Sequence, residues 1–279
     1  MRLGLVLCVL LAAGCASGPV AKLPAKRQQA IEVNNRGTAL FMRGDYAGAI
    51  AQYRAALELE RSVENEDGIA ANLINLSIAY QRQGDRAAAS AAVAGILDEG
   101  VLRFSPQRVA EAALRDAILR FDAGDADGSA GSLSRARSAC AAPCVLAGKL
   151  DNMEAQLAYE RGELEAAREA ANRALAANRA SGDRDEVANA LRLLGAIEIE
   201  RKDLAAARAA LAEALQIDKA LAVPPRIYRD LVLLGRAAAA ASDAQAARRY
   251  YARALAVARA IPDERSVAEA TRLSAALPR

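Results

Sequence analysis

The stretch "NRGTALFMRGDYAGAIAQYRAALEL", residues 35–59, decides the fold, because two runs of helical periodicity flank a short polar break at Gly44-Asp45. Small and apolar residues recur at intervals of three and four on both sides of the break, which predicts two amphipathic helices. Gly44 can adopt the left-handed conformation that ends the first helix, and the Asp45 side chain can cap the second. The stretch therefore predicts a helical hairpin with a tight turn.

The polar break returns at a nearly constant interval, with successive spacings of 40, 40, 38, 40 and 40 residues. The six breaks lie at 44–45, 84–85, 124–125, 162–163, 202–203 and 242–243. Seven positions before each break stands Gly, Ser or Ala, and five positions after it stands Ala or Ser. Such small residues let antiparallel helices approach closely, and self-similarity at this period is typical of stacked helical repeats. Lys202 and Ser242 replace Gly in the last two breaks, at a cost of about 1 kcal/mol if the left-handed conformation is kept.

These positions resemble the tetratricopeptide repeat, which has small residues at its positions 8, 20 and 27 and Gly-Asp at 15–16. Residues 35–59 match nearly throughout, and residues 72–93 and 190–215 also match well, whereas Asp116 and Arg120 depart from the apolar pattern. The period of 40 exceeds the usual 34 and resembles the extended repeats of kinesin light chains. The resemblance implies an all-α, right-handed α-solenoid with thirteen helices. The alternative is an Ala-rich helical bundle without solenoid order.

The predicted organisation has four segments along the chain. Residues 1–14 form a lipoprotein signal peptide that is removed, and residues 15–30 form a lipidated cysteine followed by a flexible tether rich in Pro, Gly and basic residues. Six repeats follow over residues 31–261, and residues 262–279 supply a C-terminal capping helix and tail.

The signal-peptide assignment depends on Arg2, on an apolar run too short to span a bilayer, and on the ending Ala12-Ala13-Gly14-Cys15. This ending resembles the bacterial lipobox, although the family prefers Leu where Ala12 stands. The resemblance implies cleavage before Cys15 and lipidation of its thiol. Because Ala16 is not the Asp that retains lipoproteins at the inner membrane, it also implies the periplasmic face of the outer membrane. An ordinary secretory signal peptide with a chance cysteine is the alternative.

The composition excludes several kinds of chemistry. The chain has no His, which rules out His-based triads and HExxH zinc sites, and it contains neither a phosphate-binding P-loop nor a GxGxxG fingerprint. Its 37 basic residues face 34 acidic ones, a balance that argues against a general nucleic-acid binder. We therefore expect no catalytic residues, no metal site, no cofactor and no nucleic-acid partner.

Cys140 and Cys144 lie where the repeat spacing drops to 38, in the loop between the third and fourth repeats. An oxidising periplasm favours a disulfide between them, and two free buried thiols are the alternative. The enclosed loop is short, so the expected stabilisation is about 2 kcal/mol.

The first helix of each repeat in this family lines a concave face, and the corresponding positions here predict a protein-binding groove. Its first half is apolar, and its second half is polar to basic. The predicted groove residues are Asn34, Thr38, Phe41, Ile74, Ile78, Gln81, Leu114, Ile118, Phe121, Asn152, Gln156, Tyr159, Asn189, Arg192, Arg229 and Arg236. An apolar strip flanked by charge suits an amphipathic helix or an extended peptide with an acidic end. The alternative is that Ile74, Ile78, Leu114 and Ile118 pack into the core.

The sequence thus predicts an outer-membrane-anchored periplasmic lipoprotein that acts as a non-catalytic scaffold. It would bind other envelope proteins or peptides through the concave face and meet the membrane only through its lipid. Lipoproteins that look like this recruit peptidoglycan hydrolases or assist the assembly of pili, secretins and outer-membrane proteins. A ligand-binding component of an uptake system is the second hypothesis, and it requires a closed, dry pocket near Phe41, Phe121 and Tyr159. A cell-wall enzyme is the third, and it requires buried carboxylates that converge in one cleft.

Overall fold

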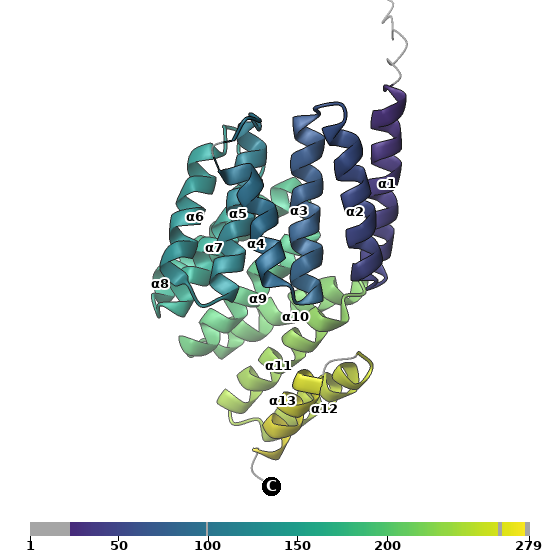
Figure 1. Cartoon of the computed structure of the whole chain (residues 1–279). Helices are drawn as coiled ribbons and strands as arrows, with labels where there is room; N and C mark the ends of the chain where they lie inside the picture. Colours follow the sequence, from purple (N-terminus) through teal and green to yellow (C-terminus); the bar gives the residue numbers. More distant parts are fainter. Residues whose placement is uncertain (1–22, 99, 262–263, 277–279) are drawn as a thin grey trace, which may run out of the picture.

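A computed structural model describes residues 23–98, 100–261 and 264–276, which form thirteen α-helices and no strand (Figure 1). The helices are α1 (Ala25–Met42), α2 (Tyr46–Arg61), α3 (Glu66–Gln83), α4 (Arg86–Leu97), α5 (Pro106–Asp122), α6 (Ala126–Ala139), α7 (Ala147–Glu160), α8 (Leu164–Ser181), α9 (Arg184–Glu200), α10 (Leu204–Ala220), α11 (Pro224–Ala240), α12 (Ala244–Arg259) and α13 (Glu264–Ala275). The predicted all-α fold with thirteen helices is confirmed.

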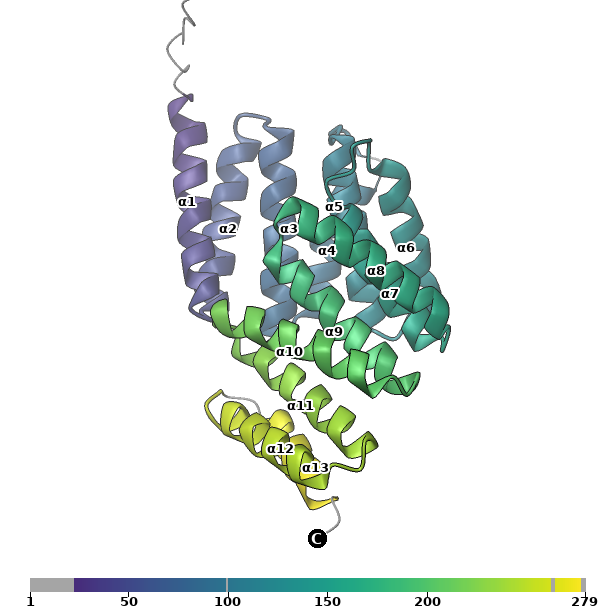
Figure 2. The ribbon, with the colours of Figure 1, turned by 180° about the vertical axis from the view of Figure 1, so that it is seen from behind.

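Each odd-numbered helix from α1 to α11 packs against the even-numbered helix that follows it, and each pair packs against the next. Figures 1 and 2 show an upright row of helices, α1 to α6, followed by helices α9 to α12, which run obliquely below that row. Helix α13 packs against α12 and closes the end of the stack, in the segment predicted to cap it. This consecutive packing of helix pairs is the expected solenoid.

The hairpin turns follow the predicted chemistry. Gly44 has a φ of 81°, and the Asp45 side chain accepts a hydrogen bond from the backbone N–H of Gly48 at 2.9 Å. Lys202 and Ser242 keep the left-handed conformation despite their side chains, with φ values of 66° and 60°. The geometry of the break is therefore conserved in space even where glycine is missing.

The small residues before each break lie where the two helices of a hairpin touch. A methyl group on Gly195 would overlap the side chain of Leu211 in α10, and one on Gly37 would come within 2.8 Å of the Tyr53 ring. Ser129, five positions after its break, is completely buried and donates its hydroxyl to the carbonyl oxygen of Ala117 at 2.8 Å. The core is thus built from small residues in close contact, as the composition implies.

Helix α1 corrects one boundary. It begins at Ala25, so the prediction of a flexible tether through residue 30 was wrong for residues 25–30. Pro24 is well tolerated at the start of a helix, where its missing N–H has no partner to lose, and Ala30 is buried against the rest of the hairpin. Cys15 and the signal segment lie outside the described residues. None of the helices in the described ranges is both long enough and apolar enough to cross a bilayer.

Candidate functional site

Helices α3, α5, α7, α9 and α11 contact one another in series. Together with α1, which carries Asn34, Thr38 and Phe41, they form the inner face of the solenoid, on which the predicted groove residues lie. The apolar members of the first half are Phe41, Ile74, Ile78, Ile118 and Phe121, and all five are half-buried. Phe41, Ile74, Ile118 and Phe121 each pack against a buried cluster on one side and keep part of their surface open. They therefore serve the core and the surface together.

Leu114 differs from these residues. It is only 7% exposed and belongs to the core cluster that also contains Leu133 and Leu157. The structure therefore supports core packing of Leu114, which was the alternative to a position in the groove.

Polar residues in the first half are held by neighbouring helices. Asn34 of α1 accepts a hydrogen bond from the amide of Asn75 in α3 at 2.9 Å, and Thr38 accepts one from the hydroxyl of Tyr53 at 3.2 Å. These bonds fix both side chains, and the polar edge of this half is therefore ordered without a ligand.

A buried arginine that sequence reasoning missed lies beside Gln81. Arg115 of α5 donates to the hydroxyl and the carbonyl oxygen of Ser77 at 3.1 and 3.2 Å, and to the amide oxygen of Gln81. Gln81 in turn donates to Asp122. Burial lowers the pKa of Arg115 to about 10, an effect that Asp122 partly opposes. Arg115 is not part of the repeat motif. The only feature of the sequence that could have indicated its role is a charged residue on an otherwise apolar helix face.

The second half of the groove is polar, and most of its side chains are already paired. Asn152 of α7 and Asn189 of α9 both donate to a carboxylate oxygen of Glu186, at 2.8 and 3.1 Å. Gln156 makes only a long contact with Glu160, at 3.5 Å. Asn152 therefore joins neighbouring repeats, Asn189 holds Glu186 from within the same helix, and Gln156 remains more available.

Arg192 lies at the centre of a charge cluster that sequence reasoning also missed. Its guanidinium pairs with Asp230 of α11 at 2.6 Å and with Asp218 of α10, and both carboxylates are completely buried. Arg226 approaches Asp218 at 3.5 Å. Burial raises the pKa of Asp230 to about 7, against the effect of Arg192 and with further help from Asp218. Arg192 is thus committed to two internal carboxylates and is not a free cation of the groove.

Arg229 is exposed, and no ion pair is described for it among residues 23–98, 100–261 and 264–276. Desolvation by the surrounding protein lowers the pKa of Arg229 most. Repulsion from Arg192 and from Arg82 of α3 lowers this pKa further, whereas Asp122 of α5 raises it. Because α11 lies below the ends of α3 and α5 (Figures 1 and 2), residues far apart in sequence share one electrostatic environment here.

Tyr159 and Arg236 continue the polar half toward the C-terminal end. Burial and the charge of Glu200 raise the pKa of Tyr159, and Arg236 opposes that rise. Arg236 also reaches Glu269 of the capping helix α13, at 3.4 Å. The capping helix therefore contributes a charge to this end of the inner face.

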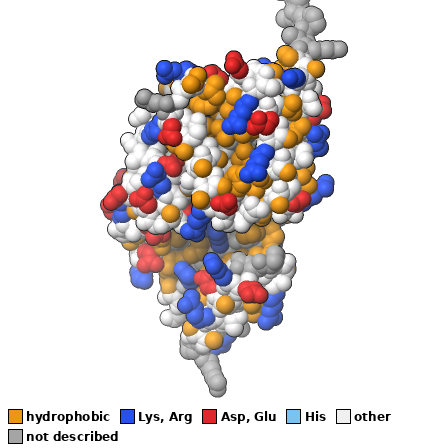
Figure 3. Space-filling view, in the orientation of Figure 1, with side chains coloured by type: hydrophobic (Ala, Val, Ile, Leu, Met, Phe, Trp, Pro, Cys, Tyr) orange, Lys and Arg blue, Asp and Glu red, His pale blue; other side chains and the backbone are white. Residues whose placement is uncertain are grey.

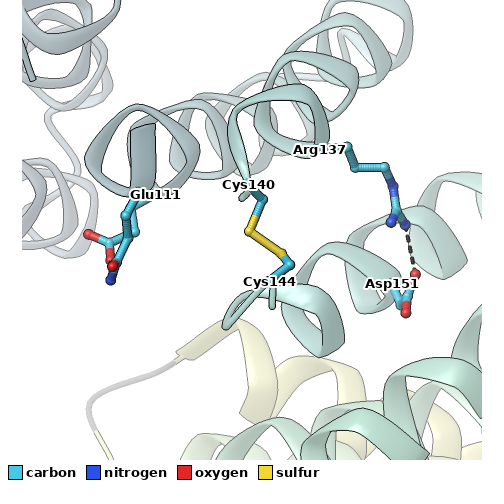
Figure 4. The surroundings of a disulfide bond; sticks show 6 residues. Glu111, Arg137, Cys140, Cys144 and Asp151 are labelled. Atoms are coloured by element: carbon cyan, nitrogen blue, oxygen red, sulfur yellow. Dashed lines mark hydrogen bonds and ion pairs between the residues drawn. A yellow bond between two sulfur atoms is a disulfide. The ribbon is translucent and has the colours of Figure 1, made fainter. Parts of the chain in front are cut away.

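Cys140 and Cys144 form a disulfide in the structure (Figure 4). Cys140 follows the last residue of α6, and both residues pack against the core cluster of the third and fourth repeats. Beside them Arg137 of α6 pairs with Asp151 of α7 at 2.7 Å. The disulfide closes the start of the loop between α6 and α7, and the ion pair joins the two helices themselves.

The chemistry that these groups can perform is limited. The described parts of the chain hold no group of three or more His, Cys, Asp or Glu residues that could bind a metal ion. Asp218 and Asp230 do converge, as the enzyme hypothesis requires, but both are inaccessible and paired with Arg192. A hollow of about 510 Å³ lies between α2, α3 and α4, and neither Phe41, Phe121 nor Tyr159 lines it.

Comparison with known proteins supports the repeat assignment. The tetratricopeptide repeat model matches residues 29–93, which cover most of the first two hairpins. No curated protein matches the chain in sequence.

Among solved structures, BtubC (BKLC) from P. vanneervenii is 21% identical over 76% of this chain and 90% of its own, with a TM-score of 0.60. PilW, described as a widely conserved type IV pilus biogenesis factor, is 16% identical over 88% of this chain and 99% of its own, with a TM-score of 0.59. PilF of Pseudomonas aeruginosa is 16% identical over 76% of this chain and 95% of its own, with a TM-score of 0.53. At these identities the likeness shows the fold alone.

Proposed function

We propose that this chain is an outer-membrane-anchored periplasmic lipoprotein that acts as a non-catalytic protein-interaction scaffold or assembly factor in the cell envelope. The observation that carries the proposal is the inner face, where Phe41, Ile78, Ile118 and Phe121 are half-buried and partly accessible. Apolar side chains left accessible in a row, with charged residues at one end, suit a peptide or helix of a partner protein.

Two further features support the location. The ending Leu11 to Cys15 resembles a lipobox, and the fold is shared with a type IV pilus biogenesis factor. Lipidation at Cys15 is tested by metabolic labelling with palmitate and by fractionation of a Cys15→Ser variant. Equal membrane recovery of the variant and the wild type would contradict the lipid anchor without touching the scaffold proposal.

The scaffold proposal is tested by affinity capture from envelope extracts with the wild type and an Ile78→Ser/Ile118→Ser variant. We expect the variant to lose its captured envelope proteins while its circular-dichroism melting curve still shows a cooperative transition. Val101→Ser is the matched control, because Val101 is 99% exposed and lies in the loop before α5. An unchanged set of captured proteins in the double variant would overturn the role of the inner face.

A further inference from the structure

One end of the upright row of helices carries the loops that connect successive repeats. Figures 1 and 2 both place the N-terminal end of α1 and the loops after α2, α4 and α6 at this end. These loops are residues 62–65, 98–105 and 140–146. The turns within the hairpins lie at the opposite end, and those of the first three repeats are polar, with Asp45, Asp85 and Asp125 as capping residues. We call the end with the repeat-connecting loops and the start of α1 the loop edge.

Exposed aliphatic side chains gather at the loop edge. Seven large hydrophobic side chains are exposed among the described residues, and five of them lie here: Leu23, Val63, Val101, Leu102 and Val145. Val101 is 99% exposed and Val145 67%, whereas Met42, at the other end of α1, is the exposed hydrophobic residue of the opposite end. Figure 3, in the orientation of Figure 1, shows hydrophobic side chains at this upper end among charged ones. The two ends of the row therefore differ in polarity.

The fold holds the loop after α4 in place. Phe104 packs against two buried clusters, and the backbone N–H of Arg103 donates to a carboxylate oxygen of Glu66 in α3 at 3.0 Å. These contacts attach the loop to the core directly after Val101 and Leu102. The exposure of the two side chains is therefore a property of a fixed loop.

The loop after α6 is uncharged throughout its seven residues, 140–146. The disulfide between Cys140 and Cys144 closes it, and Leu146 is buried in the core cluster below. Val145 lies between the disulfide and this buried leucine and is exposed. A second fixed loop thus presents an aliphatic side chain at the same end.

The position of the predicted lipidation site indicates what covers the loop edge. Leu23, which directly precedes the first residues of α1, is 45% exposed, and Cys15 stands eight residues before it in the sequence. Eight residues span at most about 28 Å when fully extended, so a lipid on Cys15 keeps the loop edge within that distance of a bilayer. The 18 residues of α1 place Met42 about 27 Å farther along the helix.

Charges of both signs flank the aliphatic side chains. Lys26 and Arg103 are the exposed basic residues that no ion pair engages among the described residues of the loop edge, and Glu64 and Asp98 are exposed acidic ones. A mixed surface of this kind gives no strong attraction to anionic lipids. Membrane contact here depends on the lipid and on the aliphatic side chains.

We infer that the loop edge contacts the bilayer that holds the lipid, with Val101 and Val145 inserted at the level of the headgroups. The inference rests on the proposed lipid anchor and adds a second membrane contact to it. Burial of aliphatic side chains strengthens a contact that a lipid alone makes weakly, and it fixes the direction of the solenoid on the membrane. The loop edge is separate from the inner face, so substitutions in these loops leave peptide binding at the inner face unchanged.

Tryptophan fluorescence tests the inference, because the chain has no Trp and one introduced tryptophan reports on a single position. Val101→Trp and Val145→Trp place it at the loop edge, and Met42→Trp, at an equally exposed site, is the matched control. The full-length lipidated proteins are reconstituted into vesicles of phosphatidylethanolamine and phosphatidylglycerol, with and without brominated lipid. Brominated lipid should lower the fluorescence of the two loop variants by about half and leave that of Met42→Trp unchanged. Melting curves of all three should match the wild type, because each replaced side chain is exposed.

Flotation of the vesicles separates this inference from the lipid anchor. A wild-type protein that does not float with the vesicles would show that the lipid anchor is wrong, and the inference would fall with it. If the wild type floats but tryptophan at positions 101 and 145 is quenched no more than at position 42, the membrane contact is overturned and the anchor stands. The exposed loops would then belong to a partner protein.

A second substitution tests whether the two loops act together. Val101→Asp in the Val145→Trp protein should reduce the quenching at position 145, because a carboxylate is costly to bring into the bilayer. Met42→Asp in the same background is the control and should leave the quenching as it was. Unchanged quenching with Val101→Asp would overturn the joint contact of the two loops.

Discussion

Asp230 is expected to make the stability of the protein depend on pH between 5 and 8. Its side chain is completely buried, and burial raises its pKa to about 7, while Arg192 of α9 opposes the rise and Asp218 of α10 adds to it. Arg226 and Arg229 of α11 are the other charged groups of this cluster. In the unfolded chain the carboxyl group has its ordinary pKa of 3.8, so between that pH and 7 the folded state holds a proton that the unfolded state lacks.

This difference in bound protons sets the direction in which stability changes with pH. The contribution of Asp230 to stability is fully present below about pH 4 and is lost as the pH rises through 7. Between pH 5 and 7 the unfolding free energy falls by about 1.4 kcal/mol per pH unit, which amounts to about 3 kcal/mol over the two units. Asp230→Asn removes the titration and keeps the size of the side chain.

Urea unfolding at pH 5 and pH 8 measures the effect. We expect the wild type to lose about 3 kcal/mol relative to Asp230→Asn over this interval. Asp127→Asn is the matched control, because the Asp127 side chain is fully exposed and its difference from wild type should be the same at both pH values. If the wild type and Asp230→Asn change in parallel between pH 5 and 8, Asp230 does not hold the extra proton and the reasoning fails.

Three further predictions concern the fold. Gly195→Ala should destabilise the protein by about 1–3 kcal/mol in urea unfolding because its methyl group meets a leucine of α10, whereas Gly131→Ala, with open space around it, should stabilise by about 0.5–1 kcal/mol. The opposite order would show that the helices of the fifth hairpin do not touch there. Lys202→Gly should stabilise the protein by about 1 kcal/mol because Lys202 has a φ of 66°, and Lys219→Gly, inside α10, should destabilise it by a similar amount. Replacing both disulfide cysteines by serine should lower the unfolding free energy by about 2 kcal/mol, and mass spectrometry of the wild type with and without reductant should show a difference of two hydrogens. Equal masses would mean that the bond is not formed.

The repeat architecture was predictable because its cause is local. A residue with a positive φ, followed by a capping Asp side chain, sets five of the six turns within two positions, as at Gly44-Asp45, whereas Glu163 in the fourth turn makes no such bond. The small residue seven positions earlier sets how closely the two helices approach, as Gly195 does against Leu211. None of these effects needs information from outside one hairpin, so six copies of the pattern were sufficient to specify the fold.

The hollow between α2, α3 and α4 could not be predicted in this way. Three alanines of α4, Ala88, Ala91 and Ala92, form one side of it, and residues of α2 form the other. Ala is common throughout the chain and usually marks close packing, so the sequence does not distinguish these three alanines from the alanines of the core. A void between helices depends on how the helices are placed relative to each other, and the periodic pattern within one helix carries no information about that placement.

The partners of the arginines in the second half of the groove could not be predicted from the sequence either. Arg192 and Arg229 both occupy positions of the repeat that face inward, and the sequence treats them alike. In the structure Arg192 pairs with Asp218 and Asp230, whereas Arg229 is exposed and is repelled by Arg82 from a repeat more than a hundred residues away. A repeat position fixes the direction of a side chain, but its partner is set by the register between repeats and by the turn of the whole solenoid. Of the predicted groove arginines, Arg229 and Arg236 are therefore the exposed ones, whereas Arg192 is committed to Asp218 and Asp230.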